Sequence, residues 1–240
     1  MNNIKIPRVI HFIWLGNHRM HPVMWEWVIR WVMFNPHWSV FIWLDDDGSR
    51  KLTRLCLSNE AYNLSTCEVF ESRNPDLLDR ACHLSQRSNI WRYEIVQEYG
   101  GLYVDTDIEP VRPIDDLVAE SSQFTVSYLR EPDHYACSFF GAVPRHAWLD
   151  DLVERLPAQD PTISLSMGSA YFTKVTRDHL DVSILPGISV VHDHNPWTQP
   201  AGVVPGVDDA RRSSNPATYA VHHWSSNWFP KGFEKLGGDK

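Results

Sequence analysis

The stretch Ser88–Pro110, SNIWRYEIVQEYGGLYVDTDIEP, decides the fold of this chain. Apolar residues recur in its first half at the spacing of a helix face, and its first residue, a serine, can cap that helix. The pair Gly100–Gly101 ends the helix, because glycine accepts the left-handed conformation that a helix C-terminus often requires. The apolar run 102–104 then predicts a short buried strand. That strand leads directly into two carboxylates, in Asp105-Thr106-Asp107.

The two carboxylates predict a metal site. Asp105 and Asp107 stand at positions i and i+2, so on an extended segment they share one side. Like charges at this separation repel, and one carboxylate then tends to retain its proton. A divalent cation removes the conflict, and hard oxygen ligands suit Mg²⁺ or Mn²⁺. Asp-x-Asp alone is common at strand ends, where it solvates a turn, but the preceding helix, glycine stop and strand favour the functional interpretation.

Upstream, the sequence predicts a strand, a helix and a second strand in close succession. Continuous apolar character suits strands covered on both faces, and strand–helix–strand with short connections is typical of a parallel sheet. We expect an α/β fold with a Rossmann-like, mostly parallel central sheet flanked by helices and a small mixed C-terminal part. The expected strands are 9–15, 39–44, 124–129 and 138–143, and the expected helices are 22–33, 50–57, 74–87, 114–120 and 146–156.

Two residues of the first strand have different expected roles. His11 lies in the middle of the apolar run, where a histidine is more often a hydrogen-bonded core residue than a ligand. Trp14 lies near the carboxyl end of the strand, which is the ligand-binding edge of open α/β sheets. Its ring serves either the core or a stacking contact with a ligand.

The last part of the chain contains a loop and an aromatic cluster. Residues 186–217 are rich in proline, glycine and polar residues and show little periodicity, which is typical of a functional loop or lid. In the following segment 219–230, His222 and His223 are adjacent and point to opposite faces of an extended strand, so only one can join a given metal site. His223 with Ser226 and Trp228 offers a nitrogen, an oxygen and an aromatic face. The alternative is an aromatic segment that docks on the sheet.

The composition bounds the remaining possibilities. The chain has 240 residues, 11 tryptophans, four cysteines without C-x-x-C spacing and a formal net charge of −8. The acidic balance argues against nucleic acid as an obligatory partner. There is no apolar run long enough to span a membrane and no signal peptide pattern, so we expect a cytoplasmic protein with free thiols, formed by a single domain over residues 1–240.

Four motifs resemble a known family. IPRVIHFIWLG, the acidic end of SVFIWLDDD, RSNIWRYEIVQEYGGLYVDTD and HHWSSNW occur in the order seen in glycosyltransferase family 32, whose motifs the clostridial glucosylating toxins share. The resemblance covers nearly the whole chain. It implies a GT-A fold, a nucleotide-sugar donor, a divalent metal and retention of anomeric configuration. It also implies a nucleotide-sugar-binding half at 1–113 and an acceptor-side half at 114–240.

The resemblance implies metal ligands near the middle and near the end of the sequence. Asp107 would bind the metal directly, and Asp105 would contact the donor ribose or a metal-bound water. His223 and Ser226 resemble the toxins' C-terminal metal ligands. An imidazole ligand suits Mn²⁺ better than Mg²⁺.

The resemblance also implies donor contacts. Trp14 resembles the residue that stacks on the base of the donor, Asp47 a nucleoside contact, and Arg92 a residue that reaches the phosphates or the sugar. Tyr103 would lie beside the donor, and Trp228 with its segment would close over it.

The chain departs from the family pattern at three places. Asn89 follows Ser88 where the family usually has an aspartate that holds donor-sugar hydroxyls, so the hydroxyl pattern that it reads can differ. Cys137 replaces an asparagine on the acceptor side. The terminal Gly-Ser-Trp of the family is Ser226-Asn227-Trp228 here.

The predicted function is a retaining, metal-dependent transfer of a hexose from a nucleotide sugar, with a UDP-sugar favoured and GDP-mannose as the alternative. The sequence carries no motif that identifies the acceptor, for which a carbohydrate, a lipid-linked sugar and a protein are the candidate classes. A catalytically silent sugar-binding module and an Asp-x-Asp phosphohydrolase are the rival hypotheses. The phosphohydrolase needs a lysine at the site, for which Lys174 is the candidate.

Overall fold

The computed structural model describes residues 5–16, 20–45, 64–68, 70–119, 121–128, 131–163, 166–191 and 216–224. Its helices are α1 (Pro22–Phe34), α3 (Pro75–Arg80), α4 (Leu84–Tyr99), α5 (Asp115–Val118), α6 (Ala147–Glu154) and α7 (Ser169–Thr176). Its strands are β1 (Val9–Trp14), β2 (Ser39–Leu44), β3 (Leu64–Glu68), β4 (Gly101–Val104), β5 (Ile108–Pro110), β6 (Gln123–Ser127), β7 (Tyr135–Ala142), β8 (Ser183–Leu185), β9 (Val190–Val191) and β10 (Ala220–His222).

The described strands form a large sheet and a small one. The large sheet has the order β3-β2-β1-β4-β7-β6-β8. β1 pairs in parallel with both β2 and β4, while β7 runs antiparallel between β4 and β6. The small sheet has the order β5-β10-β9, with β10 antiparallel to β5. The expectation of a mostly parallel central sheet with a small mixed C-terminal part is confirmed.

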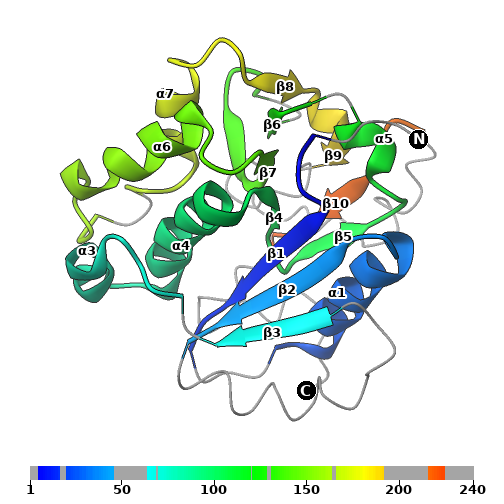
Figure 1. Cartoon of the computed structure of the whole chain (residues 1–240), viewed down its shortest axis with the longest axis horizontal. Coiled ribbons are helices and arrows are strands. Elements are labelled where there is room, and N and C mark those ends of the chain that lie inside the picture. The colour runs from blue at the N-terminus through cyan, green and yellow to red at the C-terminus, as the bar shows by residue number, and fades with distance from the viewer. Residues whose placement is uncertain are drawn as a thin grey trace, which may run out of the picture.

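Helices cover both faces of the large sheet (Figure 1). On one face, α3, α4, α6 and α7 bury an aromatic-rich core that includes Tyr93, Phe140, Trp148 and Phe172. On the other face, α1 and the small sheet enclose a second core with residues from β1, β2 and β4. Because both faces of the sheet are covered, side chains on both sides of each central strand are buried, which explains the continuous apolar runs in the sequence.

The predicted stop between α4 and β4 is present in the structure. Gly100 and Gly101 have φ angles of 64° and 94°, in the left-handed region. A Cβ on Gly101 would come within 2.5 Å of the Val9 carbonyl oxygen on the neighbouring strand. Glycine is therefore required for both the turn and the close approach of β4 to β1.

The boundary between two predicted helices is misplaced: Ser88 does not cap the second helix but lies inside α4, whose N-cap is His83. The pattern predicts a helix over 74–87, but α3 ends at Arg80 and α4 begins at Leu84. The Gln86 side chain accepts hydrogen bonds from the backbone N–H groups of Cys82 and His83, which starts the new helix. The predicted helix at 50–57 and most of the predicted loop at 186–217 lie outside the described residues.

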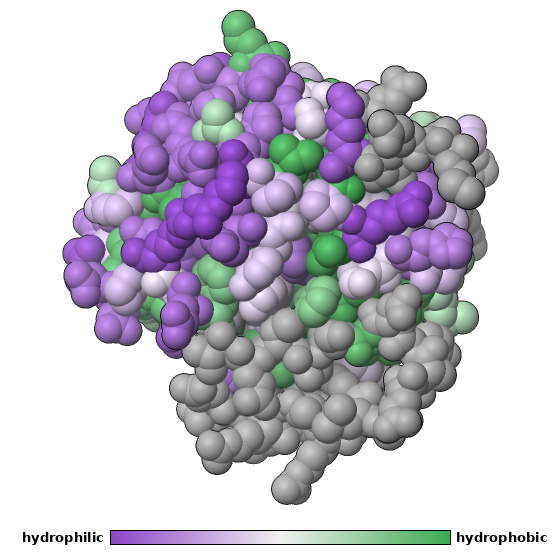
Figure 2. All heavy atoms as spheres, viewed as in Figure 1, coloured by the Kyte–Doolittle hydropathy of each residue, from purple (hydrophilic) through white to green (hydrophobic). Residues whose placement is uncertain are grey.

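The described surface over α6 and α7 is mostly hydrophilic, with hydrophobic residues in separate patches (Figure 2). These helices turn their apolar faces toward the core, as amphipathic helices on a sheet do. In the described part of the chain no helix combines the length and the apolar character needed to cross a bilayer.

Candidate active site

The site lies where β4 leaves the large sheet for β5. The Asp105 N–H donates to the Ser138 carbonyl oxygen on β7 at 2.9 Å, and the Ile108 N–H donates back to the Asp105 carbonyl oxygen at 3.0 Å. Asp105-Thr106-Asp107 is therefore a turn rather than the extended segment that the alternation argument assumed. The turn still brings the two carboxylates together, because it is closed on itself by that hydrogen bond.

The last described strand supplies a third side chain. β10 pairs with β5 so that His222 stands opposite Ile108, and the His223 N–H donates to the Asp107 carbonyl oxygen at 3.0 Å. This register places a segment from near the end of the chain against the aspartate turn. His222 Nε2 lies 3.1 Å from Asp107 Oδ1.

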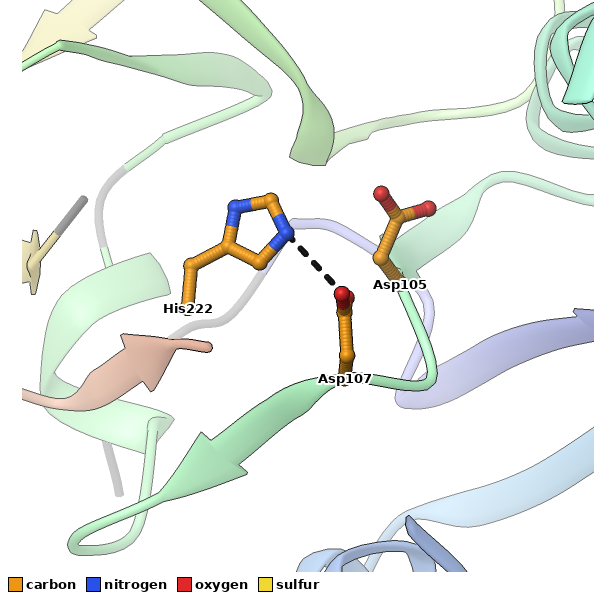
Figure 3. Close-up of side chains that lie close together, drawn as sticks. All are labelled: Asp105, Asp107 and His222. Atoms are coloured by element: carbon orange, nitrogen blue, oxygen red, sulfur yellow. Dashed lines mark ion pairs between the residues drawn. The ribbon is translucent and has the colours of Figure 1, made fainter. Parts of the chain in front are cut away.

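Asp105, Asp107 and His222 form one group (Figure 3). One potential ligand atom from each lies within 4.8 Å of the other two. Asp107 and His222 are about 95% buried, whereas Asp105 is partly exposed. Two carboxylates and an imidazole are a donor set that fits a divalent transition metal such as Mn²⁺.

The surroundings of Asp105 act on its charge in opposite directions. Burial is the largest effect and raises the pKa of this carboxyl, and the nearby charge of Asp107 raises it further. The Arg92 guanidinium, with Nη1 3.3 Å from Asp105 Oδ1, lowers the pKa, as does the Tyr103 hydroxyl, which donates to the same oxygen at 2.6 Å. A cation bound here would add a further positive charge that favours the ionised form.

Arg92 is held in place on all sides. Nη1 donates to the Cys137 carbonyl oxygen at 3.0 Å, and Nη2 donates to Ser88 Oγ at 3.2 Å. The guanidinium carbon lies 4.6 Å from the centre of the Tyr103 ring. This buried cation is therefore fixed beside the carboxylate group, with Asp105 as its nearest acidic partner.

His223 has a different environment from the one predicted for it. Its Nε2 lies 3.0 Å from Glu109 Oε2, and its ring stacks on Trp27 of α1 at 4.3 Å between centroids with an interplanar angle of 7°. Glu109 also pairs with Arg30 at 2.7 Å. The structure thus brings His222, not His223, to the two aspartates, because adjacent residues at the end of a strand face opposite ways.

The other predicted site residues are placed as follows. Trp14 is buried in the core that α1 covers, Asn89 is buried on α4 next to Ser88, and Cys137 is buried beside Arg92. The donor contacts of Trp14 and Asn89 and the acceptor-side place of Cys137 remain predictions. Asp47, Ser226 and Trp228 lie outside the described residues.

Two residues at the site were missed by sequence reasoning. Trp224, two positions beyond His222, stacks on its imidazole at 4.4 Å with an interplanar angle of 18°. Tyr128, directly after β6, stacks on Trp224 at 5.9 Å with an angle of 28°. Trp224 belongs to the HHWSSNW motif and had a local signal, but nothing near Tyr128 in the sequence indicates this contact.

Comparisons with known proteins agree with this geometry. Residues 24–124 match a family described as a glycosyltransferase sugar-binding region containing a DXD motif. The chain is 28% identical over 200 residues to inositol phosphoceramide mannosyltransferase 1 of Schizosaccharomyces pombe, which covers 77% of this chain and 57% of that protein. It is 26% identical over 131 residues to subversion of eukaryotic traffic protein A of Legionella pneumophila, which covers 51% of this chain and 20% of that protein.

Solved structures with a similar fold are also glycosyltransferases. The PaToxG glycosyltransferase aligns with a TM-score of 0.55 and 16% identity, over 73% of this chain and 69% of that one. Mouse xyloside xylosyltransferase 1 in its apo form aligns with a TM-score of 0.51 and 9% identity, over 75% of this chain and 85% of that one. At these identities the likeness concerns the fold, and it confirms the expected GT-A architecture.

Proposed function

We propose that this chain, whose residues 24–124 match a glycosyltransferase sugar-binding region containing a DXD motif, transfers a hexose from a nucleotide sugar to an acceptor hydroxyl, with a divalent cation and with retention of configuration. The observation that carries the proposal is the convergence of Asp105, Asp107 and His222 within 4.8 Å. Carboxylates alone would suit Mg²⁺, but the imidazole favours Mn²⁺.

The reaction creates charge that this group is suited to stabilise. Breaking the bond between sugar and phosphate leaves positive charge on the anomeric carbon and negative charge on the departing diphosphate. The two aspartates and His222 would hold a cation, and the bound cation would act as a Lewis acid that stabilises the negative charge of the diphosphate. Arg92 adds a fixed positive charge beside Asp105, in a buried site where electrostatic effects are strong.

The remaining roles are proposed from one hydrogen bond, for Tyr103, and from the family resemblance, for the other residues. We assign Tyr103 to the orientation of Asp105, since its hydroxyl donates to Oδ1 at 2.6 Å. Trp14, Asp47, Asn89 and Trp228 keep their proposed donor contacts, and Ser226 keeps its proposed place as a further metal ligand. Trp228, with the loop that precedes it, is proposed to close over the donor and exclude water, which otherwise competes with the acceptor, while β10 of the same segment is held in the small sheet.

The donor and acceptor are proposed by class. The yeast relative is named as a mannosyltransferase that acts on inositol phosphoceramide, which makes GDP-mannose a donor to test beside the UDP-hexoses and a lipid-linked hydroxyl an acceptor to test beside carbohydrates and proteins. The division into a donor half, 1–113, and an acceptor half, 114–240, is part of the same proposal.

The rival hypotheses make different predictions. A phosphohydrolase would use an aspartate as nucleophile with a lysine at the site, but Lys174 is exposed on α7. A silent binding module would bind nucleotide sugars without breaking them. Incubation with Mn²⁺ and a panel of UDP- and GDP-hexoses separates the three, because a transferase also hydrolyses its donor slowly in the absence of an acceptor.

The decisive variant is Asp107→Ala. We expect it to lose Mn²⁺-dependent release of nucleoside diphosphate while its circular dichroism spectrum stays that of the wild type, because Asp107 contributes a ligand rather than core packing. Asp116→Ala on α5 is the matched control, since it removes an exposed acidic residue. Full donor turnover in Asp107→Ala would reject the proposed function.

A further inference from the structure

Trp224 has a backbone conformation that a bulky residue seldom adopts. It lies two residues beyond the end of β10 and has a φ angle of 52°, in the left-handed region. Of the non-glycine residues in the described ranges, only Arg145 shares this feature. A large side chain stays in this region when its surroundings hold it there, and such residues cluster at functional sites.

Two ring contacts explain why Trp224 keeps this backbone conformation. It lies nearly parallel to the imidazole of His222, at 4.4 Å, and nearly parallel to the ring of Tyr128, at 5.9 Å. Tyr128 is anchored to the large sheet through its backbone N–H, which donates to the His134 carbonyl oxygen at 2.8 Å. Trp224 therefore joins the end of the small sheet to the end of β6 in the large one.

His222 needs such a support if it is to serve as a ligand. Its Nε2 faces Asp107 at 3.1 Å, so a rotation of the imidazole would remove the nitrogen from the carboxylate group (Figure 3). A flat ring stacked at 4.4 Å with an angle of 18° restricts that rotation. In metal sites, groups that orient a ligand are often as important as the ligand itself.

We propose that Trp224 is a positioning residue that holds the imidazole of His222 in the orientation for binding the divalent cation, with Tyr128 supporting Trp224 from the large sheet. The inference rests on the proposed function. The inference goes beyond the proposed function, because it assigns a role to a residue that contacts the ligand side chain, His222, rather than the cation. Trp224 would thus set the affinity for the metal, whereas a residue that contacts the donor would set the KM for the nucleotide sugar.

The experiment compares Trp224→Phe, Trp224→Ala and Trp224→Gly with the wild type. The half-saturating Mn²⁺ concentration is measured for donor hydrolysis at saturating nucleotide sugar, and Mn²⁺ binding is measured directly by electron paramagnetic resonance. Trp224→Gly is the informative variant, because glycine accepts the left-handed backbone while it removes the ring. Trp25→Ala is the matched control, since Trp25 is a half-buried tryptophan on α1.

We expect Trp224→Ala and Trp224→Gly to raise the half-saturating Mn²⁺ concentration about ten- to hundredfold, as losses of orienting groups do at metal sites. Trp224→Phe keeps an aromatic ring and should stay within about threefold of the wild type. The KM for the donor should change less than the Mn²⁺ requirement. Thermal denaturation of the same variants shows whether each is folded. If Trp224→Ala does not fold, Trp224→Gly still provides the test, because glycine accepts the left-handed backbone.

Unchanged Mn²⁺ affinity in Trp224→Gly would overturn the inference, and so would a change confined to the KM for the donor. These results are distinct from failure of the proposed function. If Asp107→Ala is inactive while Trp224→Gly binds Mn²⁺ as the wild type does, only the positioning role fails. If Asp107→Ala turns over donor fully, or if the wild type neither binds Mn²⁺ nor responds to it, the proposed function fails as well.

Discussion

At the scale of single residues, three histidines show how surroundings decide the role of a side chain. His222 joins two aspartates, His223 pairs with Glu109, and His11 is buried between β2 and the end of α4. His11 Nε2 donates to the Gly100 carbonyl oxygen at 2.9 Å, while Nδ1 accepts from Trp43 Nε1 at 3.1 Å. The prediction that His11 is a hydrogen-bonded core residue is confirmed, and its two partners require the neutral ring.

His11 should make the fold sensitive to mild acid. Burial is the main cause that lowers its pKa from 6.5 to about 4. In the unfolded chain His11 therefore binds a proton below about pH 6.5, whereas in the folded chain it does so only below about pH 4. The free energy of unfolding therefore falls as the pH drops from 6.5 to 4. With these values the loss at pH 5 relative to neutral pH is about 2 kcal/mol.

Urea unfolding of the wild type and of His11→Gln at pH 7.5 and pH 5 tests this expectation. Other groups titrate in the same range, so the quantity of interest is the difference between the two proteins. His11→Gln should lose less stability between these pH values than the wild type, although it is less stable at pH 7.5. His37→Gln, at an exposed position, should keep the wild-type pH dependence. Equal losses in His11→Gln and the wild type would contradict the assignment.

At the scale of elements, the glycine pair between α4 and β4 fixes where the strand that leads to the aspartate turn, residues 105–107, begins. Gly101→Ala should destabilise the fold by about 2–4 kcal/mol, because a left-handed residue gains a Cβ. That Cβ would also meet the Val9 carbonyl oxygen at 2.5 Å, an atom of a neighbouring strand that cannot move aside. Chemical denaturation measures the effect.

Gly141→Ala is the control for this prediction. Gly141 lies on β7 opposite Leu102, and a Cβ there would meet the Gly101 carbonyl oxygen at 3.0 Å, but its φ angle is not in the left-handed region. The loss in Gly141→Ala should therefore be smaller. A Gly101→Ala protein as stable as the wild type would show that β4 can shift away from β1.

The sequence predicted elements best where the pattern is local. β1, α1 and β2 appear within a residue or two of their expected bounds, because hydrophobic period, Pro22 at the helix start and Gly16 after the first strand are all local signals. The break before α4 was missed because it depends on the Gln86 side chain bonding back to two backbone N–H groups. The apolar pattern does not contain that information.

At the scale of the whole molecule, the site depends on a pairing between segments that are far apart in the chain. Strand geometry predicted that His222 and His223 would face opposite ways, which is confirmed. It did not identify which of them reaches Asp107, because that follows from the register of β10 on β5 and from the docking of His223 on Trp27. Such long-range packing has no signature in a single sequence.

The adjacent histidines should therefore separate stability from metal binding. His222→Ala should raise the half-saturating Mn²⁺ concentration at least tenfold, since it removes a proposed ligand. His223→Ala should lower the free energy of unfolding by about 1–3 kcal/mol, because it removes a buried hydrogen bond to Glu109 and the stack on Trp27. Denaturation and Mn²⁺ titration of both proteins provide the test. The opposite pattern, with His223→Ala losing Mn²⁺ affinity and His222→Ala losing only stability, would return the ligand role to His223.

The distance along the chain between the aspartate turn and its histidine has a consequence for biosynthesis. A ribosome produces Asp105 and Asp107 more than a hundred codons before His222, so the emerging polypeptide can assemble β1, β2 and β4 while the cation-binding group is still incomplete. Under the proposed function, the chain cannot bind the ion with its full set of ligands until His222 has been synthesised. A chain that stopped before β10 would carry both aspartates and lack the imidazole that completes the group.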